Sequence, residues 1–163
     1  HGSFNNQAIS RRQFQQLLAG LAAAWVIPQV ANAESANPVI SKRELVEHYD
    51  SALDAMNNLE DLRSMVDLSL VDSLRTALRG PVFGNVRIDC NYLVRHGLGP
   101  NQDQKKITDS YKQLMDSFQK LDSYALKYSR GQKDDDAAGM RTELDNIQKK
   151  FELFIAMIPN PKA

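Results

Sequence analysis

Acidic residues and a histidine lie within one predicted helical turn near the start of the chain's main body. They are Glu44, Glu47 and His48, and the spacing of four places Glu44 and His48 on one helix face. Carboxylate and imidazole groups are ordinary zinc ligands. A di-metal centre in a helical bundle needs a second Glu-x-x-His element on another helix, which this sequence lacks. We therefore interpret Glu44 and His48 as weak metal candidates at a solvated helix end and expect no bound metal.

The other side chains suited to chemistry have structural explanations. Cys90 is the only cysteine and lies in an apolar helical stretch, so we expect a small buried hydrophobe. His96 precedes a glycine-rich break, where the helix dipole favours a cation. A haem held by methionine and histidine stays a remote alternative, because there is no Cys-x-x-Cys-His motif and methionines on a bundle stripe usually pack. Phosphate-loop and nucleophile motifs are also missing, so we expect no catalytic residue and no enzyme activity.

Arginines gather around a Gly-Pro pair in the middle of the chain. Arg75, Arg79, Arg87 and Arg95 flank Gly80-Pro81, all within one predicted helical segment. Guanidinium groups bind carboxylates in a bidentate manner, so this segment could clamp acidic residues of a partner protein. The alternative is a solvated polar face, which every soluble helix has. The spacing alone does not separate the two interpretations.

Helical periodicity predicts the elements that carry these residues. Apolar residues recur at steps of three and four over about 41–66, 69–96, 103–129 and 135–158, and almost no stretch alternates with the period of a strand. Ser41 and Glu44 form a capping-box pattern at the first start. Short breaks between the segments predict an all-α, up-down-up-down antiparallel four-helix bundle. The second helix is predicted to be kinked or broken at Gly80-Pro81, with a kink as the first choice and a new helix beginning at Pro81 as the second.

The N-terminus has the pattern of an export signal. Arg11-Arg12 precede an apolar run of about 11 residues, and Ala31-Asn32-Ala33 follows as a small-residue cleavage site. The run is too short to span a bilayer, and the paired arginines are typical of twin-arginine signals. We expect residues 1–33 to be a cleaved targeting signal and 34–163 to form the bundle. The alternative is an amphipathic helix of the mature protein.

The charge balance restricts the class of partner. Twenty basic and twenty acidic residues cancel in the whole chain, and the first 33 residues contain no acid. Without its two N-terminal arginines the body is slightly acidic, with 18 basic against 20 acidic residues. This balance gives no reason to expect a nucleic-acid partner.

Three segments of the sequence resemble the PsbQ family of extrinsic photosystem II proteins, over roughly residues 42–159. They are Leu-Arg-Gly-Pro-Val-Phe-Gly-Asn-Val-Arg at 78–87, Lys-Lys-Ile at 105–107 with Leu114, Phe118 and Leu121-Asp122, and Phe-Glu-Leu-Phe-Ile-Ala-Met-Ile-Pro at 151–159. Phe83 is an extra residue relative to the family's Gly-Pro segment. Cyanobacterial members also carry an anchoring cysteine at the cleavage site, where this chain has Ala33-Glu34. These differences favour a member from a plastid-bearing alga of the red lineage.

The resemblance implies a function that the residue patterns alone do not give. It implies a subunit of the plastid thylakoid lumen, peripheral to the membrane, that docks on the lumenal surface of the photosystem II core beside other extrinsic subunits. Such proteins help to retain calcium and chloride at the manganese cluster without binding a cofactor directly, and they have no small-molecule substrate. An assembly factor, or a lumenal subunit of another thylakoid complex, is the alternative within the same fold. Partner-binding candidates are Arg75, Arg79, Gly80, Pro81, Arg87 and Arg95.

Overall fold

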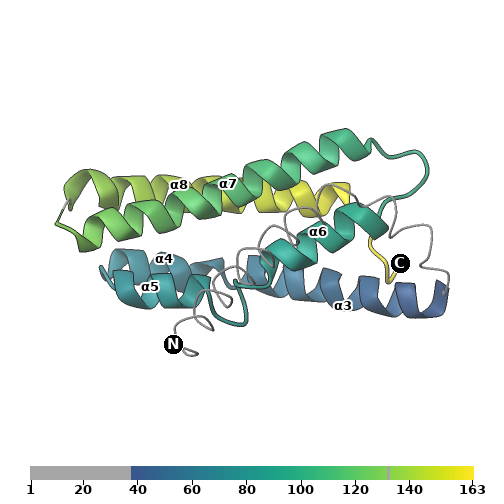
Figure 1. Cartoon of the computed structure of the whole chain (residues 1–163), viewed down its shortest axis with the longest axis horizontal. Coiled ribbons are helices and arrows are strands. Elements are labelled where there is room, and N and C mark those ends of the chain that lie inside the picture. The colour runs from purple at the N-terminus through teal and green to yellow at the C-terminus, as the bar shows by residue number, and fades with distance from the viewer. Residues whose placement is uncertain (1–37, 132) are drawn as a thin grey trace, which may run out of the picture. The chain divides into compact units, whose positions relative to one another are not determined.

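The part of the chain described by the structure is helical. The computed structural model describes residues 38–131 and 133–163, in which no strand is found. The helices are α3 (Pro38–Asn57), α4 (Leu59–Asp67), α5 (Val71–Leu78), α6 (Val86–His96), α7 (Gln104–Ser129) and α8 (Asp134–Met157) (Figure 1). They belong to one compact unit, Val39–Ala163. None of the described helices combines the length and apolar character needed to cross a membrane.

The first predicted helix is divided in two. It begins at Pro38, so the predicted start at Ser41 is wrong; a proline suits the first helical turn because its missing N–H would have no partner there. Asn58 separates α3 from α4, whereas we predicted one helix over 41–66. The side-chain amide of Asn58 donates to the backbone carbonyl of Asp54 at 2.6 Å and to the Asp54 carboxylate at 3.2 Å. Such local bonds compete with the helical ladder, which accounts for the interruption.

The second predicted helix is broken at Gly80-Pro81 and not merely kinked. Helix α5 ends at Leu78 and α6 begins at Val86, so the predicted break at Gly80-Pro81 is confirmed, whereas the preferred kink and a helix start at Pro81 are wrong. The intervening 79–85 segment is closed by its own bonds. The Gly84 amide donates to the Gly80 carbonyl at 2.8 Å, and the Asn85 side chain donates to the Pro81 carbonyl at 2.9 Å. Proline removes a helical donor, and these turn bonds replace the helical ones.

Helices α7 and α8 follow the predicted bounds closely. Asp103 caps α7 by accepting from the Lys106 amide at 3.1 Å, and three aspartates occupy the first turn of α8, where the helix dipole favours them. Ile158 is extended because Pro159 follows it. The two helices share the most extensive interface and run in opposite directions across the short 130–133 connection (Figure 1). They form an antiparallel hairpin.

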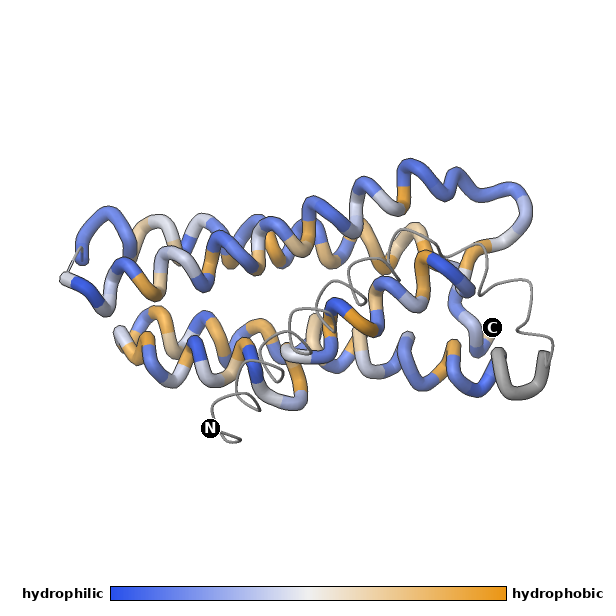
Figure 2. The backbone as a smooth tube through the Cα atoms, viewed as in Figure 1, coloured by the Kyte–Doolittle hydropathy of each residue, from blue (hydrophilic) through white to orange (hydrophobic). Residues whose placement is uncertain are grey.

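The core lies between this hairpin and the shorter helices. Figure 2 shows apolar positions recurring along the helices between hydrophilic ones. Helix α8 contacts α4, and α7 contacts both α5 and α6. The predicted stripe of the last helix is confirmed, since all its members are buried: Met140, Leu144, Ile147, Phe151, Ile155 and Ile158. In α3 the predicted Tyr49 is buried together with Ala52 and Ala55, while the predicted Leu53 and Met56 are half-buried.

Candidate functional site

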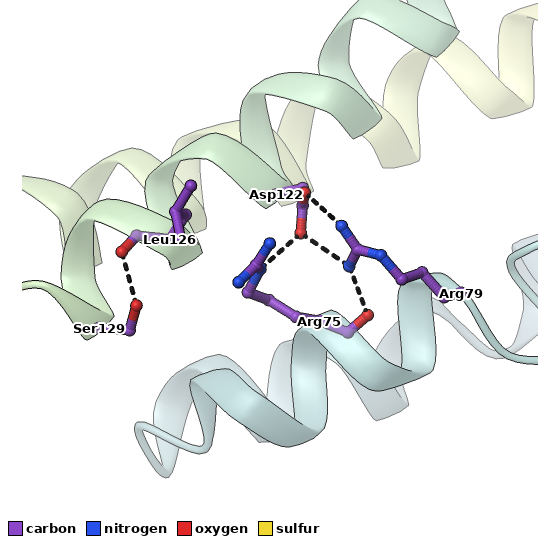
Figure 3. Close-up of polar contacts among 5 residues, drawn as sticks. All are labelled: Arg75, Arg79, Asp122, Leu126 and Ser129. Atoms are coloured by element: carbon purple, nitrogen blue, oxygen red, sulfur yellow. Dashed lines mark hydrogen bonds and ion pairs between the residues drawn. The ribbon is translucent and has the colours of Figure 1, made fainter. Parts of the chain in front are cut away.

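Two of the predicted arginines converge on one carboxylate of α7. Arg75 donates from Nε to Asp122 Oδ1 at 3.0 Å. Arg79, the residue that follows α5, donates to both Asp122 oxygens, at 3.2 and 2.9 Å, and also to the Arg75 carbonyl at 2.9 Å (Figure 3). The Asp122 side chain is 29% exposed, against 58% for Arg79. The cluster joins α5 to α7 and lies at the protein surface.

The cluster holds its charges in place and keeps an excess of positive charge. Burial alone would raise the pKa of Asp122, but hydrogen bonds from Arg79 and Arg75 outweigh it and hold that pKa below its ordinary value of 3.8. The same hydrogen bond raises the pKa of Arg79. One carboxylate faces two guanidinium groups, so one positive charge is left uncompensated within the cluster. Arg75 and Arg79 therefore have a partner within the chain, and their contact with carboxylates of another protein stays a prediction.

Two surface clefts lie on either side of Arg79. One, of about 400 Å³, is lined by Asp72, Arg75, Thr76 and Arg79. The other, also of about 400 Å³, lies between the 79–85 segment, the start of α6 and the middle of α7. We call this second one the Phe83 cleft; its lining residues are Leu78, Arg79, Phe83, Gly84, Val86, Arg87, Met115, Phe118, Gln119 and Asp122. The insertion relative to the PsbQ pattern, Phe83, is thus a buried residue of the core that also faces this cleft.

The remaining predicted partner residues are not gathered in one place. The four arginines do not share one helix: Arg75 lies in α5, Arg79 begins the 79–85 break, and Arg87 and Arg95 lie in α6. Arg87 is exposed and lines the Phe83 cleft. Arg95 lines neither of these clefts, and its Nε atom is buried without a hydrogen-bond partner among the described residues. Pro81 is exposed, and Gly80 accepts the bond that closes the turn.

The weak metal candidates belong to a polar cluster between α3 and α6. His48 Nδ1 lies 2.8 Å from Asp89 Oδ1, and the Ser51 hydroxyl donates to Asp89 Oδ2 at 2.5 Å. Tyr92 donates its hydroxyl to Glu44 at 2.8 Å, and its ring stacks on that of His48 with 4.2 Å between centroids. Asp89 is only 4% exposed. Glu44 and His48 do share a helix face, as predicted, and both meet α6.

The α3–α6 cluster does not have the arrangement of a serine-nucleophile site. In a serine-nucleophile site the imidazole stands between the hydroxyl and the carboxylate, so that it can take the hydroxyl proton. Here Asp89 stands between Ser51 and His48, and both bond to the carboxylate. No group of three metal-ligating side chains is found within the described ranges. The cluster supplies a buried carboxylate with two partners and so fastens α3 to α6.

Two further candidates from the sequence have structural roles. Cys90 is fully buried, as expected, and burial raises the pKa of its thiol well above the ordinary range. His96 lies in the last turn of α6, with its ring 4.5 Å from that of Tyr92. Burial, the nearby charge of Arg95 and that of His48 lower the pKa of His96, and Glu44 offsets part of that change.

Sequence reasoning missed Asp122 and Asp89 as the residues on which both clusters depend. Each is an acid on a helix whose partners lie at least 38 residues away, so no local spacing reveals the pairing. The available signal was an acidic residue next to a core position: Asp122 follows Leu121, and Asp89 precedes Cys90. An acid beside the apolar stripe is partly or fully removed from solvent and needs a basic or hydroxyl partner.

The predicted signal residues Arg11, Arg12, Ala31 and Ala33 lie outside the described residues. Comparison with protein-family models, with curated proteins and with solved structures finds no match to this chain. The PsbQ resemblance therefore stays a prediction that rests on the three quoted segments.

Proposed function

We propose that this chain is a non-catalytic docking subunit of the PsbQ type, an extrinsic protein on the lumenal side of photosystem II. The observation that carries the proposal is the place of the Gly-Pro segment. The residues with the most specific resemblance form the 79–85 connection, and that connection borders a surface cleft with apolar walls and arginines at its mouth. Surfaces of this kind, apolar inside and charged at the edge, suit contact with another protein.

The architecture that we propose for it is an up-down-up-down four-helix bundle. In this interpretation α3 and α4 together form the first helix of the bundle, and α5 and α6 together form the second. Helices α7 and α8 are the third and the fourth. The breaks at Asn58 and at 79–85 then become local interruptions of the first two helices. The contacts of α4 with α5 and α8, and of α7 with α5, α6 and α8, support this assignment.

The mechanism that we propose is stabilisation by binding alone. A protein that binds the assembled state of a partner better than the dissociated state shifts the equilibrium toward the assembled one. Docked on the lumenal surface of the core beside other extrinsic subunits, the bundle would slow the loss of calcium and chloride from the manganese cluster. The chain would supply no ligand to that cluster. The proposed location is the plastid thylakoid lumen, at the membrane periphery.

Release and rebinding of the protein test this function. Thylakoid particles stripped by a salt wash should lose oxygen evolution at low calcium and chloride, and adding back this chain should restore much of it. Equal activity with and without the chain would contradict the proposal. Presence of the chain only in immature, inactive particles would instead identify an assembly factor.

The docking face is tested by charge reversal at Arg87. We expect Arg87→Glu to weaken rebinding while the helical circular-dichroism signal is unchanged, because Arg87 is exposed at the start of α6. Arg130→Glu, an exposed change just after α7, is the matched control. Rebinding weakened equally by both changes would show that overall charge, and not this face, controls docking.

A further inference from the structure

Five apolar side chains line part of the Phe83 cleft. Its side chains come from three elements that the break at Gly80-Pro81 brings together: the end of α5, the 79–85 segment with the first turn of α6, and the middle of α7. The apolar lining residues are Leu78, Phe83, Val86, Met115 and Phe118. Phe83 and Val86 belong to the buried core, and Phe118 packs edge-on against Phe151 of α8. The floor of the cleft is therefore fixed by the fold.

The mouth of the cleft carries more positive than negative charge. Arg79 and Arg87 line it together with a single carboxylate, Asp122, and Arg75 reaches that carboxylate from the other side. The neighbouring cleft adds only Asp72 to this set. Among the described residues, the lining of the Phe83 cleft thus holds two guanidinium groups and one carboxylate. A ligand with negative charge beside an apolar group complements both the mouth and the wall.

The size of the cleft limits what can occupy it. A volume of about 400 Å³ is at the lower end of the range for ligand sites, roughly 300–1,000 Å³, and suits one or two large side chains. A chain segment laid across the mouth of the cleft would place an apolar side chain in the cleft and its flanking residues against the arginines.

From these features we infer that the Phe83 cleft binds a short acidic segment of a partner protein. One large apolar side chain of the segment enters between Phe83 and Phe118, and adjacent carboxylates meet Arg79 and Arg87. Arg79 stays paired with Asp122, which Arg75 also contacts, and these two guanidinium groups exceed the one carboxylate by one positive charge. This inference rests on the docking function proposed above and specifies its face and the chemistry of its partner.

A synthetic peptide of the sequence Gly-Asp-Glu-Phe-Glu-Asp-Gly, blocked at both ends, is the probe. Titrated into the ¹⁵N-labelled protein, it should shift the amide signals of Gly84, Arg87 and Gln119 and leave that of Gly99 unchanged. A peptide with alanine in place of phenylalanine, and one with lysines in place of the acids, should each bind at least about fivefold more weakly. Equal binding of the lysine peptide, or shifts only outside the cleft, would overturn the inference.

Two matched variants identify the cleft as the binding site. Gln119 lines the cleft and is exposed, so Gln119→Glu places a negative charge at its mouth without disturbing the core. Gln113→Glu makes the same change at an exposed position of the same helix, outside the cleft lining. We expect at least about fivefold weaker peptide binding for Gln119→Glu and no change for Gln113→Glu. Equal effects of the two variants would contradict the assignment.

Rebinding to salt-washed thylakoid particles separates this inference from the proposed function. If Gln119→Glu loses both peptide binding and rebinding, the cleft is the docking face. If it loses peptide binding but rebinds like the unmodified chain, the cleft is not that face and the inference fails while the proposed function stands. Failure of the unmodified chain to rebind would refute the photosystem function, and the peptide titration would still decide the cleft's chemistry. Two further outcomes would overturn the inference. If the chain self-associates and Gln119→Glu abolishes this, the occupant of the cleft is a second copy of the chain. If anionic phospholipid vesicles bind as strongly as the acidic peptide, the occupant is a lipid surface.

Discussion

Neutralising Asp122 tests how much the arginine cluster contributes to stability. Asp122→Asn keeps the size of the side chain but removes the charge that receives three N–H bonds, at 3.0, 3.2 and 2.9 Å. Hydrogen bonds to charged groups contribute about 1.5–3 kcal/mol, whereas exposed ion pairs contribute about 0–1 kcal/mol. Asp122 is only partly buried and Arg79 is more than half exposed. We therefore expect the free energy of unfolding to fall by about 1–2 kcal/mol, a value between these two ranges.

The contribution of Asp122 to stability should decrease in acid. Because the folded-state pKa of Asp122 lies below its ordinary value of 3.8, its stabilising contribution is complete above that value and is lost as the pH falls through the folded pKa. The difference in unfolding free energy between the unmodified chain and Asp122→Asn should therefore be constant near neutral pH and shrink as the pH falls below the ordinary carboxyl pKa of 3.8. Urea unfolding followed by circular dichroism at several pH values measures it.

A neighbouring acid supplies the control. Asp116 pairs with Lys120 on the exposed face of the same helix, with both side chains more than half exposed. Asp116→Asn should leave the unfolding midpoint nearly unchanged, because exposed pairs are screened by solvent. If both variants lose the same stability, or if the loss in Asp122→Asn persists unchanged in acid, the α5–α7 ion cluster is not the source of the effect.

Three other predictions follow from close contacts and buried groups. Gly84→Ala should destabilise the chain by about 1–3 kcal/mol, because a Cβ there would lie 2.5 Å from the Gly80 carbonyl oxygen. A Cβ at Gly99 would make only an ordinary contact, 4.0 Å from the Gln102 side-chain oxygen, so Gly99→Ala should be nearly neutral; thermal melts compare the two. Asp89→Ala should cost about 2–4 kcal/mol in urea unfolding, since it leaves a part-buried imidazole and hydroxyl without their shared acceptor, and a loss under 1 kcal/mol would contradict that role. The pKa of His96 lies below its ordinary value of 6.5, so stability should fall as the pH drops from about 7 to 5, and His96→Gln should reduce that fall; an unchanged pH profile in the variant would refute it.

The sequence predicts the helices well where periodicity and caps act together. The last two helices have long stripes with regular steps, an aspartate cap and a terminal proline, and their observed bounds differ from the predicted ones by a residue. For the first predicted helix, the prediction of an uninterrupted helix is wrong, and for the second the preferred kink is wrong, because each is broken near its middle. An asparagine bonded to its own preceding turn, and a seven-residue segment closed by turn bonds, do not alter the spacing of apolar residues, so the pattern runs across both breaks.

The sequence indicated which basic residues belong to the arginine cluster, but not which acidic residue they contact. Grouping Arg75 with Arg79 was sound, because spacing of four places them on one face, but their shared acceptor lies on another helix. The Phe83 cleft depends on how the broken second helix meets α7. That arrangement is a result of packing between distant segments, which residue spacing does not encode.

The tail after α8 has a consequence for how the chain folds. Lys162 lies 2.6 Å from Asp50 of α3, across 112 residues of sequence, and Gln102 donates to the Met157 carbonyl at 2.9 Å. Contacts between residues so far apart form late, because the intervening chain must first be ordered. The α7–α8 hairpin needs only a short loop to close. We therefore expect the C-terminal half to collapse first, with α3 joining last and the tail fastening it in place.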